Sequence, residues 1–80
     1  MICKFRAVFD DGCQFDFGVI NFNADKILKR FKAKLKRHIK ENGYDKDLFW
    51  GRLYRQYHDR SFGPAIAAAN GTDCGWCNLY

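Results

Sequence analysis

The chain has 80 residues, enough for one domain spanning residues 1–80, and an aromatic content of 18% excludes a disordered tail. No run of about 18 apolar residues occurs, so we expect no membrane span and no membrane partner. The net charge of +5 is unevenly distributed, because residues 26–40 contain eight of the fourteen Lys and Arg residues and none of the nine acidic ones. That segment is therefore +8 and the remainder −3, a pattern typical of a surface that contacts a polyanion or an acidic partner.

The first twenty residues predict a β-hairpin. Apolar side chains occupy the odd positions on both sides of Asp-Asp-Gly at 10–12, and Asp-Gly between alternating apolar runs is a strong hairpin signal. A three-residue loop gives a register that pairs Phe9 with Cys13, Phe5 with Phe17, and Cys3 with Val19. The odd positions then share one Phe-rich face, which another element must cover.

The basic segment predicts the covering element, a helix over about residues 24–42. Asn23 is suited to the N-cap and Gly43 to the left-handed residue after the last turn. At 100° per residue, one arc of about 120° collects the apolar side chains: Ile27, Leu28, Phe31, Leu35 and Ile39. The basic side chains fill an opposite arc of about 200°.

Residues 46–60 are compatible with a helix or a strand. The adjacent apolar pairs Phe49-Trp50 and Leu53-Tyr54 fit a period of 3.6 better than a period of 2, so we predict a helix. Residues 64–70, with proline at the first position, predict a further short helix. The path of residues 61–80 is otherwise open, and a C-terminal edge strand is one alternative. The predicted fold class is thus α+β: an N-terminal antiparallel hairpin, with or without a third edge strand, covered by a long basic amphipathic helix, plus a second shorter helix.

The cysteines do not predict a metal or redox site. Cys-Gly-Trp-Cys at 74–77 has the spacing of a redox dithiol or of half a zinc site, but too few residues follow it to form the helix that a redox dithiol needs. Cys3 and Cys13 lie about 20 Å apart at opposite ends of the predicted hairpin, so they cannot share one ion, and only one of them with His38 or His58 would complete a set. We therefore expect no metal, no cofactor and free thiols in a cytoplasmic protein, with His38 packed against the apolar arc.

The basic helix is the leading functional candidate. An ordinary surface helix mixes charges of both signs, whereas like charges repel one another and call for a partner of opposite sign. We therefore predict a non-enzymatic binding module that contacts nucleic acid through this face: Lys26, Lys29, Arg30, Lys32, Lys36, Arg37 and Lys40. A secondary contact by stacking or charge is predicted for Trp50, Arg52 and Arg55.

Two alternatives belong to other functional classes. The first is a small protein-binding inhibitor or adaptor, of the phage anti-defence type, whose basic helix docks on an acidic surface of a nucleic-acid-processing partner. The second is a small metal-free ribonuclease centred on His58, which has Arg55, Tyr57 and Arg60 as sequence neighbours. The sequence contains no phosphate-binding glycine loop, no paired catalytic carboxylates and no Ser-His-Asp order, so we do not expect an enzyme.

Overall fold

The N-terminal hairpin forms with the predicted register. The computed structural model describes residues 2–72 and 74–79, with only the backbone of Cys74. Strand β1 (Ile2–Phe9) pairs antiparallel with β2 (Gln14–Ile20). Phe5 lies opposite Phe17 and Cys3 opposite Val19. At the turn, the Phe9 N–H donates to the Cys13 carbonyl at 2.9 Å, which confirms the three-residue loop.

The predicted helix is also confirmed. Helix α1 (Ala24–Asn42) begins after Asn23, whose side-chain oxygen accepts a hydrogen bond from the Lys26 N–H at 3.1 Å. It ends at Gly43, which has a φ of 68° and donates its N–H to the Ile39 carbonyl, as a left-handed C-terminal residue does. Four apolar side chains of α1 are buried against the sheet: Ile27, Phe31, Leu35 and Ile39.

The prediction of a helix over residues 46–60 is wrong. Residues Trp50–Gln56 form strand β3, which pairs antiparallel with β1 in the middle of the sheet. The alternation is concealed because one of its core-facing residues is Gly51, where an added Cβ would lie 2.9 Å from Cδ1 of Phe9 and 3.2 Å from Cδ1 of Leu35. The core therefore requires glycine at that position, and the apolar period of 2 disappears from the sequence.

The prediction of a short helix over residues 64–70 is wrong as well. Residues Phe62–Asn70 form strand β4, in which Ala67 and Ala69 are fully buried. Alanine prefers helices, but helix preferences differ by less than about 1 kcal/mol per ordinary residue, so burial in the packed sheet overrides them. Pro64 lies where the β3–β4 register shifts, between the pairs Tyr54–Ala65 and Gln56–Phe62, and such an irregularity is one of the few places a strand accepts proline.

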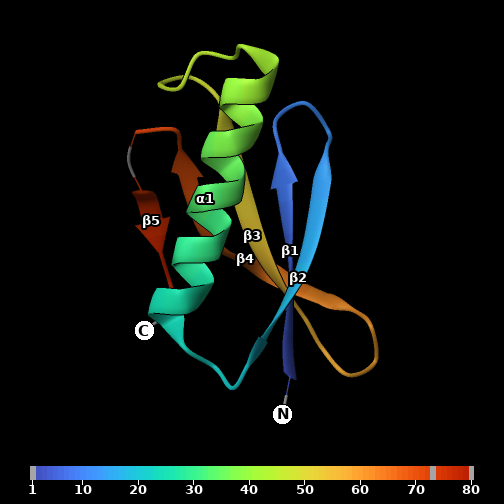
Figure 1. The fold of residues 1–80 in the computed structure, drawn as a ribbon. Helices are drawn as coiled ribbons and strands as arrows, with labels where there is room; N and C mark the ends of the chain where they lie inside the picture. The colour runs from blue at the N-terminus through green and yellow to red at the C-terminus, as the bar shows by residue number, and fades with distance from the viewer. Residues whose placement is uncertain (1, 73, 80) are drawn as a thin grey trace.

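The C-terminal edge strand, left open above, is present. Strand β5 (Cys74–Cys77) pairs with β4 and completes an antiparallel sheet of five strands in the order β2-β1-β3-β4-β5. Helix α1 lies across one face of this sheet (Figure 1). In the described part of the chain, no helix combines the length and the apolar character needed to cross a membrane.

The two faces of the sheet differ. The face under α1 contains the core, with Phe5, Leu53 and Ala67 almost completely buried. Because paired residues of neighbouring strands share a face, the other face presents the alternate residues of β1 and β3: Lys4, Arg6, Val8, Arg52, Tyr54 and Gln56. Two acidic residues partly neutralise that open face, since Arg6 bonds Asp16 at 2.7 Å and Arg52 lies 3.9 Å from Asp10.

Candidate nucleic-acid interface

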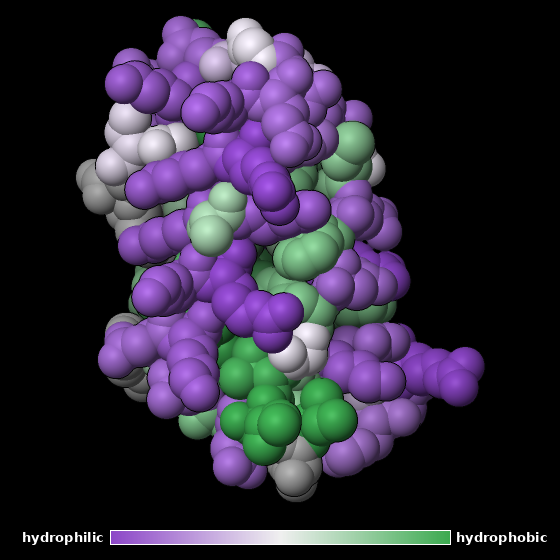
Figure 2. Space-filling view, viewed as in Figure 1, coloured by the Kyte–Doolittle hydropathy of each residue, from purple (hydrophilic) through white to green (hydrophobic). Residues whose placement is uncertain are grey.

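The basic side chains of α1 are displayed together on its outer face. Six of them are exposed: Lys26, Lys29, Arg30, Lys36, Arg37 and Lys40. Lys32 and Lys34 are half-buried. Figure 2 shows that hydrophilic side chains cover most of the molecular face on which α1 lies. The seven residues predicted as an anion-binding surface therefore come from one straight element whose opposite side is anchored in the core.

Two of these cations, Arg30 and Lys34, contact residues of β2. Arg30 donates to the Gly18 carbonyl at 2.7 Å, and its guanidinium lies 5.3 Å from the centre of the Phe17 ring. The Lys34 ammonium lies 4.5 Å from the centre of the Phe15 ring. With Arg37 they line an open hollow of about 410 Å³ between the helix and the hairpin. These two cations are therefore held in place by contacts with the sheet.

Most cations of α1 have no carboxylate partner in the described part of the chain. Among the residues that the structure describes, Arg37 is the one Lys or Arg of α1 that forms an ion pair with a carboxylate, at 3.4 Å from Glu41. The ammonium groups of Lys29, Lys36 and Lys40 form no such pair with a described residue. Because few intramolecular partners compete for them, these ammonium groups are available to an external anion.

The three residues predicted as a secondary contact do not share one surface. Trp50 and Arg52 are alternate residues of β3 and belong to the open face of the sheet, opposite the core. Arg55 belongs to the covered face, where its guanidinium lies 5.3 Å from the centre of the Phe22 ring and 3.9 Å from Sγ of Cys3. A single ligand on the basic helix therefore does not reach Trp50 and Arg52 as well.

A second basic site lies at the β3–β4 turn. Among the residues that the structure describes, three cations and one histidine, and no carboxylate, line a hollow of about 280 Å³ there: Lys4, Arg55, Arg60 and His58. Arg60 has a φ of 68°, in the left-handed region that non-glycine residues seldom adopt. Strand β1 contributes Lys4 to this hollow, and the end of β3 with the turn after it contributes the other three groups.

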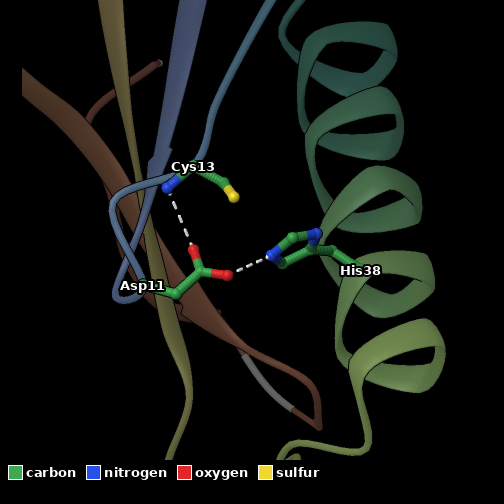
Figure 3. A group of neighbouring side chains, drawn as sticks. All are labelled: Asp11, Cys13 and His38. Atoms are coloured by element: carbon green, nitrogen blue, oxygen red, sulfur yellow. Dashed lines mark hydrogen bonds and ion pairs between the residues drawn. The ribbon is translucent and has the colours of Figure 1, made fainter.

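A third cluster joins the hairpin turn to α1 (Figure 3). His38 Nε2 and Asp11 Oδ2 are 2.6 Å apart, and Asp11 Oδ1 accepts the Cys13 N–H at 3.0 Å. Tyr44 donates its hydroxyl to Asp11 Oδ2 at 3.0 Å. The histidine ring packs against Phe9 with 5.0 Å between ring centres, and its side chain is 16% exposed, which confirms the expected packed histidine.

The electrostatics of this cluster favour a carboxylate and a protonated thiol. Partial desolvation raises the pKa of Asp11, but hydrogen bonds from His38, the Cys13 N–H and Tyr44 outweigh it and lower the pKa to about 2. Desolvation and the neighbouring Asp11 carboxylate raise the pKa of the Cys13 thiol. Both ring nitrogens of His38 also have neighbours, because Asn42 Nδ2 lies 3.4 Å from Nδ1. The arrangement is therefore not that of a cysteine nucleophile activated by a histidine base.

Sequence reasoning missed this cluster, although two signals pointed to it. His38 lies at the margin of the apolar arc of α1, which is the arc that faces the hairpin, and Asp11 and Cys13 flank the turn glycine. The contact between them depends on the position of the helix along the hairpin, and hydrophobic periodicity does not define that position.

Comparison with protein-family models, with curated proteins and with solved structures gives no match.

Proposed function

We propose that the protein is a non-enzymatic module that binds nucleic acid through the phosphate contacts of α1. The supporting observation is one helix with eight basic side chains, six of them exposed, and no acidic residue within residues 26–40. From Lys26 to Lys40 the helix extends about 21 Å at 1.5 Å per residue, which is long enough for about three or four side chains to reach phosphates along one duplex.

The composition of this face favours nucleic acid over an acidic protein. Protein interfaces have an apolar centre rich in aromatic residues and are depleted in lysine. On α1 the centre of the basic arc is Ala33, and the residues around it are cations. A face of this kind gains affinity by releasing counterions from a phosphate backbone. Apart from the exposed Ile20 beside its first turn, it offers a protein partner little apolar surface to bury.

A titration of labelled duplex DNA, single-stranded DNA and RNA with the full chain at low salt tests the proposal. We expect binding with little dependence on base sequence, because phosphate contacts do not distinguish bases. Absence of binding to all three probes at low salt would contradict it, and would leave the acidic-partner alternative in which the same helix docks on a protein.

The hollow at the β3–β4 turn favours a second candidate, a metal-free ribonuclease. In this candidate Lys4, Arg55 and Arg60 bind the phosphate and His58 acts as general base toward the neighbouring hydroxyl. The favouring observation is that these four groups line one hollow to which no described residue contributes a carboxylate. Their side chains come from β1, β3 and the turn after it, so the sheet brings them together.

Incubation of the purified chain with labelled RNA tests this candidate. This candidate, unlike the non-enzymatic module, predicts slow cleavage that His58→Ala reduces by about 100-fold or more, in the range for loss of a general base. Arg52→Ala, on the open face of the sheet and outside the hollow, is the matched control and should leave the rate unchanged. Cleavage that survives His58→Ala would show that a contaminant or another site is responsible.

A further inference from the structure

We propose that Asp11, Cys13 and His38 form a binding site for one divalent transition-metal ion, with Zn²⁺ as the best-matched ion. The site lies between the β1–β2 turn and α1 (Figure 3). It goes beyond nucleic-acid binding and does not depend on it, since none of its three residues belongs to the basic face.

The donor set is that of a zinc site. One imidazole nitrogen, one thiolate sulfur and one carboxylate oxygen are the three ligand types that Zn²⁺ takes in proteins, and the sulfur disfavours Mg²⁺ and Ca²⁺. The three donor atoms all lie within 4.8 Å of one another. Two ligands of a tetrahedral zinc ion are about 3.4–3.6 Å apart. Side-chain movements of about 1 Å form the site: they open the 2.6 Å contact between His38 and Asp11, which the ion replaces, and bring the Cys13 thiol closer.

The protein positions two of the ligands and leaves the third adjustable. His38 is on a capped helix, and its ring packs against Phe9 and Phe49, with 5.0 Å and 5.8 Å between ring centres. Asp11 is fixed by the Tyr44 hydroxyl at 3.0 Å, and a hydrogen-bonded ligating carboxylate is a common feature of metal sites. Cys13 is exposed at the edge. Its thiol can turn inward and bind as the thiolate, releasing its proton to solvent.

The sheet order separates this site from the other described cysteines. Cys77 is on β5 and Cys13 adjoins β2, at opposite edges of the five-stranded sheet, so about four strand spacings, roughly 19 Å, lie between them. Cys3 is buried at the far end of β1. One ion at the turn therefore has Cys13 as its sulfur ligand, with a fourth position open to water.

Titration of the reduced full chain with Co²⁺, followed by absorbance, tests the site. We expect one ion per chain, a thiolate-to-cobalt charge-transfer band in the near ultraviolet, and displacement of Co²⁺ by Zn²⁺. Cys13→Ser should abolish the band and weaken binding by at least about tenfold. The exposed position of Cys13 makes this variant compatible with folding, which circular dichroism will verify. Cys77→Ser is the matched control and should retain the band.

Three results would overturn the proposal. The first is the absence of a charge-transfer band at saturating Co²⁺. The second is a band that persists in Cys13→Ser and disappears in Cys77→Ser, which would place the ion at the C-terminal cysteines. The third is a folded His38→Gln variant that binds Co²⁺ as tightly as the parent chain, because an imidazole ligand cannot be lost without cost.

Discussion

Replacing Lys29, Lys36 and Lys40 together by glutamine should weaken nucleic-acid binding by roughly 100-fold or more at about 0.1 M salt. Each phosphate contact contributes close to a factor of ten at that salt concentration through counterion release. The three ammonium groups form no ion pair with a described residue, and glutamine keeps the helical preference of lysine. The affinity should therefore fall while the far-ultraviolet circular dichroism and the unfolding midpoint stay the same.

A matched variant separates the helix face from net charge. Lys4, Arg6 and Arg52 lie on the open face of the sheet, away from α1, and changing all three to glutamine lowers the net charge from +5 by 3, to +2, as the helix variant does. This control should lose less than about tenfold, since long-range attraction alone is largely screened at that salt concentration. Equal losses in the two variants would contradict a localised binding face.

Leu53→Ala should lower the free energy of unfolding by about 2–5 kcal/mol, the usual cost of removing a buried leucine side chain. Leu53 is 0% exposed in the central strand β3, opposite Ala7 and Ala67. A domain of this size has a total stability of about 4–12 kcal/mol, so the substitution removes a large part of it. Urea unfolding followed by tryptophan fluorescence measures the change.

Leu48→Ala is the control for that experiment, because the chemical change is identical and Leu48 is 73% exposed in the turn before β3. Its cost should stay within about 0.5 kcal/mol. Equal costs for the two leucines would contradict a core that contains Leu53 and excludes Leu48.

The hairpin and the first helix were predictable because every level of signal agreed there. Asp-Gly defined the turn, odd positions defined the face, and Asn23 and Gly43 defined the helix ends, each of which has the expected hydrogen bonds. Local preference and tertiary packing favour the same structure in residues 2–43, and such agreement makes short-range reasoning succeed.

Strands β3 and β4 were not predictable because their inward positions are shaped by the neighbouring elements. Gly51 is small since Phe9 and Leu35 occupy the adjacent space. Ala67 and Ala69 lie in the covered face, where 0% of each residue is exposed. Small residues at the inward positions hide the alternation of apolar and polar side chains that identifies a strand. A run of alanines then has the composition typical of a helix. Only the packed sheet supplies the missing information.

The same distinction applies to the candidate sites. The basic face was accessible from the sequence, because charge on one side of one helix needs no tertiary information. The cluster of Asp11 and His38 joins residues 27 apart in sequence, and the hollow with Lys4 and His58 joins β1 to a turn that follows β3. Both depend on the positions of β3 and α1 against the hairpin, which the predicted second helix would have changed.

The salt dependence of duplex binding tests the central claim most directly. With about three or four phosphates contacted by α1, log K should fall against log salt with a slope of about −3, at 0.9 per contact. In the variant with Lys29, Lys36 and Lys40 changed to glutamine, the magnitude of the slope should decrease toward zero, by about one for each lost contact. A slope near zero for the parent chain, or a slope that the variant leaves unchanged, would contradict phosphate binding by this helix.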